Sequence, residues 1–299
     1  MKTKEIKSII NEKKWENADV VMLSAPYDKT ASSHKGTVNG PKAVIKNLAT
    51  QIEFYDRKLK VEVIDFVKTS HIDLGNLNKF KPSEVLKKIN KQTDKLLEKD
   101  KFVFVLGGEH SVPLGLYQSL AKKYNPKDVT ILQIDAHLDM RNDDSDYSSK
   151  PTDLAHSTIM RRAHELGYNI VNVGARSFST DEIGYVNQNQ NITIFESGYP
   201  KKLPNIEEIL KSIKTKYLYI TIDVDGFDPS VMPGTGTPVP GGLSWDYGME
   251  LLNKAISKFE LIGADIVEVS PQKETVITEY ASAQLAYSII TKKFQNKLK

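Results

Sequence analysis

The chain has 299 residues, of which 39% are hydrophobic and 26% charged, a balance typical of a globular protein with one large core. It contains no cysteine, which excludes disulfides, thiolate nucleophiles and sulfur-ligated zinc, so any metal ion must bind to histidine and carboxylate. The formal net charge of +3 comes from lysines spread along the chain and gathered at 292–299, a pattern more typical of a solvated helix end than of a nucleic-acid-binding module.

The N-terminal segment, residues 1–14, mixes Lys and Glu with isolated apolar residues and does not resemble a secretory signal. No apolar run along the chain approaches the ~18 residues that a membrane span needs. We therefore expect a cytoplasmic protein that binds neither a membrane nor nucleic acid.

Short β-branched apolar runs alternate with stretches of helical period, which is typical of a parallel sheet covered by helices on both faces. We find no repeat, no low-complexity segment and no linker rich in Pro and Gly, so a single α/β domain over residues 1–299 is expected. The apolar runs predict about eight strands, at 20–24, 61–66, 102–106, 129–134, 170–173, 192–195, 218–222 and 262–267.

Four helices are predicted from their starting residues and their apolar period. Pro41 is expected in the first turn of one helix, after Asn39-Gly40. The other three are expected after Ser83 to about residue 100, after Ser244 at 245–259, and at about 279–294.

Two polar stretches fit neither helix nor strand, and each follows a predicted strand. Residues 141–152 are rich in Asp and Ser, and residues 225–243 contain Pro and Gly at short intervals. In open α/β sheets, ligands bind beyond the carboxyl ends of the strands. We therefore expect the chemistry of the protein at these loops.

The segment Asp135-Ala136-His137-Leu138-Asp139 follows the strand at 129–134 and gathers three possible ligands within one turn of loop. Hard and borderline divalent ions bind this mixture of imidazole and carboxylate. Alone, the motif fits a capping Asp beside a core His equally well, because short motifs recur by chance.

Asp223 and Asp225 close the strand at 218–222, and the alternation of an extended chain sends both side chains to one face. Two carboxylates that face each other repel unless a cation lies between them. The neighbouring Asp228-Pro229 is better explained as a turn or a helix cap.

Gly107-Gly108-Glu109-His110-Ser111 ends the strand at 102–106, where the glycines allow a sharp turn and Ser111 is expected to cap a helix. His110 alone could be a polar loop residue, but it falls at the same edge of the sheet as the two acidic clusters. Together the three clusters supply two imidazoles and four carboxylates, enough for two metal ions that share bridging carboxylates.

Glu268 ends the strand at 262–267, which is otherwise apolar and in which an unpaired carboxylate would be costly. It therefore either points into the site or pairs with a structural Arg. His156 and Asp153, beyond the polar loop, are further candidates. Three histidines lack acidic neighbours at useful spacing and are interpreted as surface or structural residues: His34, His71 and His164.

These motifs resemble those of the ureohydrolase family, the arginases and agmatinases, from Gly36 to the C-terminal helix and in the family's order. The similarity is greatest to agmatinases. It implies a three-layer α/β/α fold of the arginase type, two Mn²⁺ ions per chain at the carboxyl edge of the sheet, and a homo-oligomer, either a trimer or a hexamer. The matching segments are Gly-Gly-Glu-His-Ser, Asp-Ala-His-Leu-Asp, Asp-Val-Asp-Gly-Phe-Asp-Pro, Gly-Thr-Gly-Thr-Pro-Val-Pro-Gly-Gly and Asp-Ile-Val-Glu-Val.

The resemblance also implies two sets of metal ligands, which share Asp135 and Asp223 as bridges. Two cations lower the pKa of a bridging water, so that hydroxide can attack the planar guanidinium carbon and urea is released. One ion would bind His110, Asp135, Asp139 and Asp223, and the other His137, Asp135, Asp223 and Asp225.

Further roles carried over by the resemblance concern the substrate. Asp139 would orient the hydroxide, and Glu268 would hold the guanidinium by charge-assisted hydrogen bonds. His156 would shuttle a proton to the departing amine. Thr237 is expected to line the pocket.

Agmatine, cleaved to putrescine and urea, is the predicted substrate. Arginases recognise the amino-acid head group partly through Ser and Asn shortly before the catalytic His, where this chain has Leu154. The segment 156–163 resembles the agmatinase version, although Ala155 and Ser157 depart from it. His156 counts against a formimidoylglutamase. Four carboxylates beside this segment suit a substrate with a cationic tail, or simply form a solvated loop: Asp143, Asp144, Asp146 and Asp153.

Other functions stay open from the sequence. An arginase or a guanidino-acid hydrolase of the same family is possible. For a guanidino-acid hydrolase, Arg161 or Arg162 would be expected near the substrate carboxylate. A catalytically inactive family member that acts as a binding protein, or a basic nucleic-acid partner, is disfavoured because all six predicted ligands are present together with His156 and Glu268.

Overall fold

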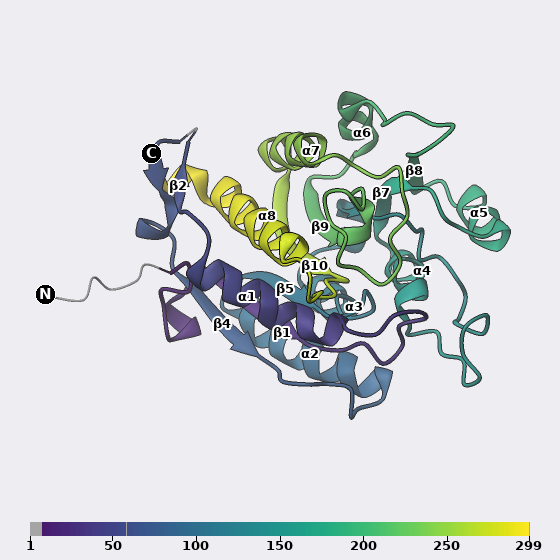
Figure 1. Cartoon of the computed structure of the whole chain (residues 1–299), viewed down its shortest axis with the longest axis horizontal. Coiled ribbons are helices and arrows are strands. Elements are labelled where there is room, and N and C mark those ends of the chain that lie inside the picture. Colours follow the sequence, from purple (N-terminus) through teal and green to yellow (C-terminus); the bar gives the residue numbers. More distant parts are fainter. Residues whose placement is uncertain (1–7, 58, 299) are drawn as a thin grey trace, which may run out of the picture.

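The centre of the molecule is an eight-stranded sheet in the order β4-β1-β5-β10-β9-β6-β7-β8, in which every neighbouring pair is parallel (Figure 1). The structure is a computed structural model and describes residues 8–57 and 59–298. The strands are β1 (Val20–Ala25), β4 (Thr69–Asp73), β5 (Phe102–Gly107), β6 (Val129–Ile134), β7 (Asn169–Ala175), β8 (Ile192–Glu196), β9 (Tyr217–Asp223) and β10 (Glu260–Val267).

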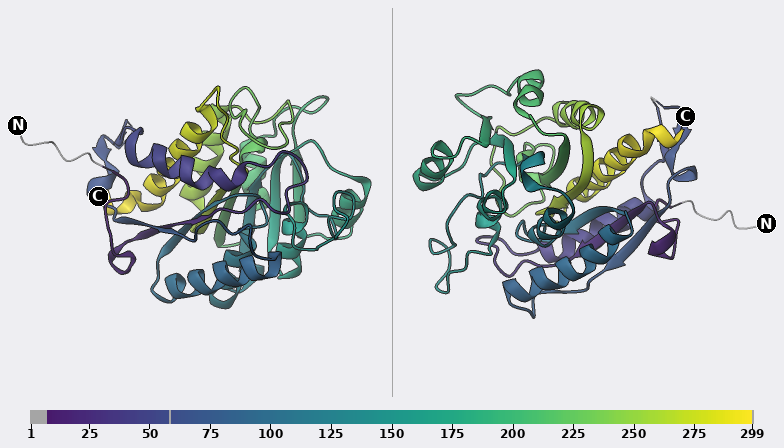
Figure 2. Two further views of the ribbon diagram at one scale, coloured as in Figure 1. Left: turned by 60° about the horizontal axis from the view of Figure 1, so that its bottom comes forward. Right: turned by 180° about the vertical axis from the view of Figure 1, so that it is seen from behind.

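Helices cover both faces of this sheet and enclose two hydrophobic cores (Figure 2). The first core is shared with α1 (Gly40–Thr50), α6 (Ile206–Ser212), α7 (Trp245–Lys258) and α8 (Ile277–Phe294). The second is shared with α2 (Pro82–Glu98), α3 (Leu114–Lys123), α4 (Ile159–Glu165) and α5 (Thr180–Asn187). The predicted three-layer α/β/α fold is thus confirmed.

Strand β5 shows why the apolar runs are nearly continuous. Phe104 and Leu106 belong to the first core, whereas Val103 and Val105 belong to the second. A parallel sheet between two helical layers is buried on both faces, so both sets of alternate positions must be apolar. Each such side chain contributes roughly 1.5–3 kcal/mol relative to an exposed one.

One predicted strand is wrong. Residues 61–66 supply only the short strand β3 (Val61–Glu62), which pairs antiparallel with β2 (Tyr55–Asp56), and a 3-10 turn at Val63–Asp65 follows. The eighth strand of the sheet is instead β4, whose sequence Thr-Ser-His-Ile-Asp is largely polar. An edge strand that is partly exposed needs no continuous apolar run, and the apolar pattern therefore did not reveal it.

Two predicted helix caps are also wrong, and two helix starts are confirmed. Ser83 lies inside α2, which begins at Pro82. Ser111 does not cap α3, because Pro113 precedes that helix and the Ser111 hydroxyl donates to Glu109 Oε1 at 2.7 Å. Pro41 does lie in the first turn of α1, and Ser244 caps α7.

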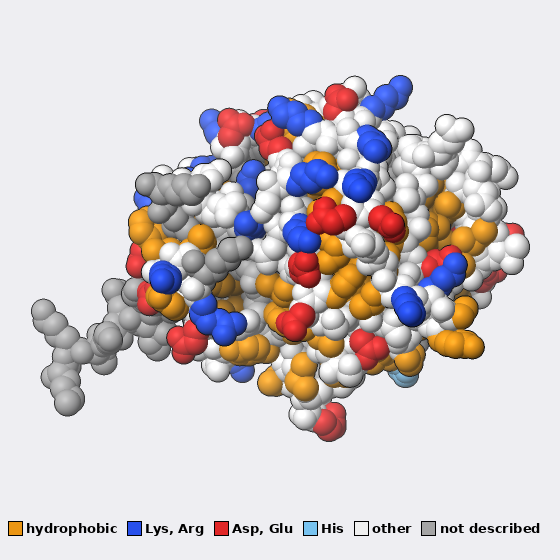
Figure 3. All heavy atoms as spheres, turned by 90° about the horizontal axis from the view of Figure 1, so that it is seen from above, with side chains coloured by type: hydrophobic (Ala, Val, Ile, Leu, Met, Phe, Trp, Pro, Cys, Tyr) orange, Lys and Arg blue, Asp and Glu red, His pale blue; other side chains and the backbone are white. Residues whose placement is uncertain are grey.

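Charges of both signs are mixed on the surface. On the face in Figure 3, Lys and Arg side chains lie among Asp and Glu and do not form a single basic patch. Lys254 illustrates this mixing, since its Nζ is 2.9 Å from the carboxylates of both Glu207 and Glu250. None of the helices in the described part of the chain has the length and apolar content needed to cross a membrane.

Candidate metal centre

Four adjacent strands, β5, β10, β9 and β6, bring the predicted site residues to one edge of the sheet. His110 follows β5, Asp135 follows β6, Asp223 ends β9 and Glu268 follows β10. Pairing of Val267 with Asp223 brings the last two strands to the same level. Because β9 and β10 are inserted between β5 and β6, segments far apart in the sequence meet where ligands bind in open α/β sheets.

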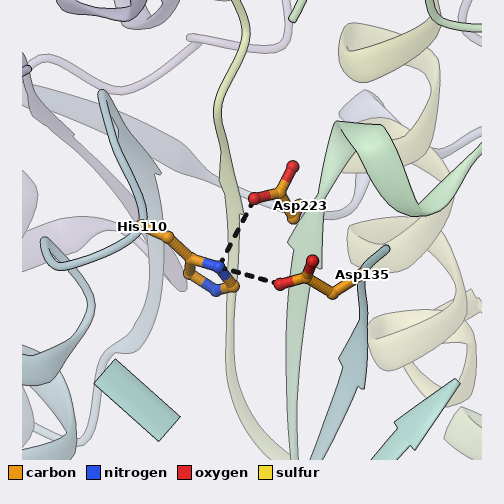
Figure 4. Close-up of side chains that lie close together, drawn as sticks. All are labelled: His110, Asp135 and Asp223. Atoms are coloured by element: carbon orange, nitrogen blue, oxygen red, sulfur yellow. Dashed lines mark ion pairs between the residues drawn. The ribbon is translucent and has the colours of Figure 1, made fainter. Parts of the chain in front are cut away.

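The first group of possible metal ligands surrounds Nδ1 of His110. This nitrogen lies 3.1 Å from Asp135 Oδ2, 3.0 Å from Asp139 Oδ2 and 3.5 Å from Asp223 Oδ2. Figure 4 shows the ring pointing toward Asp135 and Asp223. His110 is fully buried, and its Nδ1 makes no hydrogen bond of good geometry with any described residue. A buried imidazole nitrogen that faces three carboxylate oxygens is an arrangement that suits a divalent cation.

The opposite nitrogen of His110 fixes which tautomer the ring adopts. Its Nε2 lies 2.9 Å from Thr221 Oγ1, and the Thr221 hydroxyl donates its single proton to Asp265 Oδ1 at 2.7 Å. Nε2 must therefore carry a proton and donate it to Thr221, so that in the neutral ring the lone pair lies on Nδ1. This is the outer hydrogen bonding that orients metal-binding histidines. Sequence reasoning missed both Thr221 and Asp265.

A second group lies around His137, whose Nδ1 is 3.1 Å from Asp225 Oδ2 and 3.6 Å from Asp135 Oδ1. Within the described residues, ligand atoms of two sets lie within 4.8 Å of one another: His110 with Asp135 and Asp223, and Asp135 with His137 and Asp225. Asp135 belongs to both sets. This is the position expected of a bridging ligand.

The electrostatics of the cluster also fit a cation. Burial and then the Asp135 carboxylate raise the pKa of Asp139 to about 7. Burial and then Asp225 raise the pKa of Asp223 well above its ordinary range. Burial lowers the pKa of His137, but Asp225 and Asp135 raise it to about 12. The site thus gathers buried carboxylates, and burial and mutual repulsion raise the pKa of two of them; divalent ions would relieve this repulsion.

Backbone strain occurs at two of the site residues. Asp139 has φ +54° and Glu268 has φ +61°, in the left-handed region that non-glycine residues avoid. Such a conformation costs roughly 1–3 kcal/mol and persists only where neighbours enforce it. Here the Glu268 N–H donates to Gly108 O at 2.8 Å, and Asp139 O accepts the Met160 N–H at 3.0 Å.

His156 and Glu268 lie side by side next to the metal groups. His156 Nδ1 is 3.9 Å from Glu268 Oε1, which accepts the His110 N–H at 3.0 Å. Burial and the nearby His137 and His110 lower the pKa of His156 to about 4. Burial and Glu109 raise the pKa of Glu268 well above its ordinary range. A cationic group bound between them would favour the ionised carboxylate.

A cavity of about 470 Å³ opens over this cluster. Its lining includes side chains of both metal groups, Asp139 and Asp223 of the first and His137 and Asp225 of the second, together with His156 and Glu268. Thr237 lines it as predicted, and its hydroxyl donates to Asp225 Oδ2 at 3.0 Å. His34 is exposed but also lines the cavity, so its interpretation as a mere surface residue is incomplete. Other lining residues that the sequence did not indicate are Ser32, Ser33, Arg141, Tyr147, Ser177, Phe178, Ser179 and Glu182.

Of the two interpretations of the acidic loop, the structure does not support the one in which its carboxylates face the substrate. Of the described residues that line the cavity, none is Asp143, Asp144, Asp146 or Asp153. Asp144 is buried and accepts the Thr152 N–H at 2.6 Å, Asp146 pairs with Arg141, and Asp153 lies 3.3 Å from Arg162. The loop instead contributes Arg141 and Tyr147 to the cavity.

The two arginines expected near a substrate carboxylate also lie outside the cavity. Arg161 and Arg162 lie at 3.4 and 2.9 Å from Glu165 on the surface of α4, and neither lines the cavity. Among the described Lys and Arg residues, Arg141 is the one that lines it. His71 and His164 bind Ser24 and Tyr185, which confirms their structural interpretation.

Comparison with known proteins agrees with this geometry. The sequence model of the arginase family matches residues 18–291, and the chain belongs to that family. It is 32% identical to an N(1)-aminopropylagmatine ureohydrolase of Synechocystis over 92% of this chain and 89% of the relative. It is 35% identical to an agmatinase of Bacillus subtilis over 88% and 87%. The structure of an agmatine ureohydrolase of Thermoplasma volcanium superposes with a TM-score of 0.81 at 26% identity, covering 99% of this chain and 97% of that one.

Proposed function

We propose that this member of the arginase family, a hydrolase of guanidino C–N bonds, cleaves agmatine to putrescine and urea with the help of two Mn²⁺ ions. The observation that carries the proposal is one cavity lined by side chains of both metal-binding groups and by the His156–Glu268 pair. Imidazole and carboxylate donors of this kind suit Mn²⁺.

Six side chains are proposed as metal ligands. His110 and Asp139 would bind one ion, His137 and Asp225 the other, and Asp135 and Asp223 both. The distances around His110 and His137 support the first four, and the presence of Asp135 in both groups supports its bridging role. Two divalent cations, when bound, supply an activated water as the nucleophile.

The remaining residues would act on the substrate. Glu268 would accept hydrogen bonds from the guanidinium, each worth about 1.5–3 kcal/mol because both partners are charged. Asp139, beside His110, would orient the attacking water. His156 would pass a proton to the departing amine, which is a poor leaving group until it is protonated.

The charged residues of the cavity wall favour a cationic tail over a carboxylate. Arg141 lines the cavity, but its guanidinium is already paired with Asp146 and lies 4.0 Å from Glu182. A substrate carboxylate would have to break these contacts, whereas an ammonium group would meet Glu182. Leu154 packs among the apolar residues beside α4 and has no group that could hold the carboxylate of arginine.

A longer substrate of the same class, N(1)-aminopropylagmatine, is a second candidate. The cavity adjoins a neighbouring hollow of about 550 Å³, with which it shares Ser33, His34, His137, Ser177, Gly236 and Thr237. That hollow would accommodate an extended polyamine tail. The Synechocystis relative, which matches 92% of this chain, is named for this substrate.

A urea-release assay with added Mn²⁺ across agmatine, N(1)-aminopropylagmatine, arginine and 4-guanidinobutyrate tests the proposal. We expect kcat/KM for agmatine to exceed that for arginine at least ~10-fold, or about 1.4 kcal/mol, because burying an unpaired carboxylate costs a few kcal/mol. A preference for arginine would show that an unidentified donor binds its carboxylate. A preference for 4-guanidinobutyrate would show that Arg141 leaves its partners.

A further inference from the structure

The loop at residues 28–36, between β1 and α1, contacts the ring of His156. The backbone N–H of Ser32 donates to His156 Nε2 at 3.2 Å. We propose that this N–H holds His156 as the neutral tautomer protonated on Nδ1, so that Ser32 positions His156 for catalysis. The inference rests on the proposed function for its catalytic meaning, although the tautomer itself can be observed without any reaction.

The tautomer follows from the geometry of donors and acceptors. A neutral imidazole has one N–H donor and one lone-pair acceptor, while the protonated ring has two donors and no acceptor. A backbone N–H can only donate, so the Nε2 that receives the Ser32 N–H must carry the lone pair. The proton of the ring therefore sits on Nδ1, the atom 3.9 Å from Glu268 Oε1.

The loop is held in place at both ends by Asp28. This buried carboxylate accepts the Gly36 N–H at 2.9 Å and the Val38 N–H at 3.3 Å. Asn78 makes two hydrogen bonds with Asp28. Its side-chain N–H donates to Asp28 Oδ1 at 2.7 Å, and its side-chain oxygen accepts the Asp28 N–H at 2.9 Å. The Ser32 N–H thus belongs to a loop whose position is fixed by these hydrogen bonds.

The buried Glu109, which has no role in the proposed chemistry, also holds the loop in place. The hydroxyl of Thr30 donates to Glu109 Oε1, and the Ser111 N–H donates to Glu109 Oε2 at 2.9 Å. The Glu109 N–H in turn donates to Tyr27 O at 2.7 Å. Glu109 precedes the proposed ligand His110, so the loop is joined directly to the segment that would hold a metal ion.

This arrangement has a consequence for proton transfer. A neutral ring that lost its Nδ1 proton would become an imidazolate, so the ring must first gain a proton. A solvent proton can add to Nε2 only when the Ser32 bond opens. Nδ1 can then give its proton to the departing amine, which leaves a neutral ring protonated on Nε2. Renewal of the Ser32 contact then favours the tautomer with the proton on Nδ1, the atom that delivers the next proton, so loss of the Ser32 N–H should slow turnover.

The matched variants are Ser32→Pro, which removes the N–H, and Ser32→Ala, which keeps it. We expect kcat of Ser32→Pro to be roughly 10- to 100-fold below that of Ser32→Ala, within the range of general acid–base effects, with similar KM and bound metal. Lys35→Pro is the control for a proline in this loop, because Lys35 is exposed and its N–H has no partner among the described residues. It should retain activity.

A double-mutant cycle separates positioning of His156 from a general effect on structure. In a His156→Ala background, Ser32→Pro should cause no further loss of kcat. An additive loss would overturn the proposal. If Ser32→Pro does not fold, Thr30→Val, which releases the loop from Glu109, should give a smaller loss that also disappears in the His156→Ala background.

Neutron diffraction of the metal-loaded protein tests the tautomer independently of activity. We expect a deuteron on His156 Nδ1 and none on Nε2. A deuteron on Nε2 in the resting protein would overturn the inference even if agmatine is hydrolysed. Conversely, a deuteron on Nδ1 in a protein that releases no urea would contradict the proposed function and leave the tautomer assignment standing.

Discussion

The metal edge and the outer wall of the cavity are built in different ways. Residues of the metal edge stand at the ends of β5, β6, β9 and β10, where sheet register fixes their relative positions. The outer wall comes from loops and helix starts, including Ser32, Arg141 and Glu182. Strand ends can be aligned from local patterns alone, whereas the direction that a loop side chain takes depends on partners far away in the sequence.

The largest effect should come from the metal edge. Asp135→Ala should lose more metal than Asp225→Ala, because Asp135 belongs to both ligand groups. If Asp135→Ala loses several kcal/mol of transition-state stabilisation that the metal ions supply, kcat should fall by roughly a thousand-fold or more. Elemental analysis should find two Mn²⁺ per chain in the unmodified protein. One ion or none after reconstitution would contradict the two-metal site, and equal losses in both variants would remove only the bridging role of Asp135.

The six proposed ligands illustrate what could be predicted. Each stands within a few residues of an apolar run, and the rule that parallel strands end at one edge was enough to group them. The positive φ of Asp139 could not be predicted in this way, since nothing in a local pattern distinguishes a strained aspartate from a relaxed one. Nor could β4, whose polar sequence reflects its place at the edge of the sheet.

Thr221 and Asp265 could have been found from the sequence. They are direct partners on β9 and β10, and each is a buried polar residue in an apolar run, the same signal that singled out Glu268. By contrast, no local signal points Arg141 into the cavity and turns Asp144 away from it. That outcome depends on hydrogen bonds and ion pairs within the folded loop.

His156 belongs to the boundary between the two regions, because it begins the turn before α4 and contacts the loop at Ser32. His156→Ala should lower kcat by roughly ten- to ten-thousand-fold, while both metals stay bound. This range includes typical general acid–base effects and extends to smaller ones. Thermal melting and metal content should match those of the unmodified protein. Near-normal turnover in such a folded, metal-loaded variant would rule out proton transfer by His156.

The support behind the metal edge should be measurable separately. Thr221→Val removes the hydroxyl that links His110 Nε2 to Asp265, while keeping the shape of the side chain. We expect metal affinity to fall by roughly 10- to 100-fold, as for other residues that orient metal ligands. Titration of the metal-free protein with Mn²⁺ measures this. An unchanged affinity would show that His110 is oriented by packing alone.

The outer wall should control the choice of substrate more than the rate. Arg141→Ala leaves Glu182 without its neighbouring cation and should raise the preference for agmatine over 4-guanidinobutyrate by about 10-fold. Glu182→Gln should shift the preference the other way, and its similar size preserves the start of α5. Ratios of kcat/KM for the two substrates provide the measurement. Shifts in the same direction would show that the substrate tail does not reach these residues.

The smallest expected effect concerns strain. Lys60, with φ +58°, is exposed and far from the site in the sequence, whereas Glu268, with φ +61°, lies in it. Lys60→Gly should stabilise the fold by about 0.5–1 kcal/mol, because relief of the left-handed conformation outweighs the added entropy of the unfolded chain.

Glu268→Gly should relieve similar strain and remove a buried carboxylate, so that the metal-free protein gains at least as much stability, but urea release should be lost. Denaturant unfolding of both variants and the urea assay test this pair. If Glu268→Gly were less stable than the unmodified protein, its contact with the His110 N–H would outweigh the strain. Glu268 would then be held in place by the fold and not only by its function.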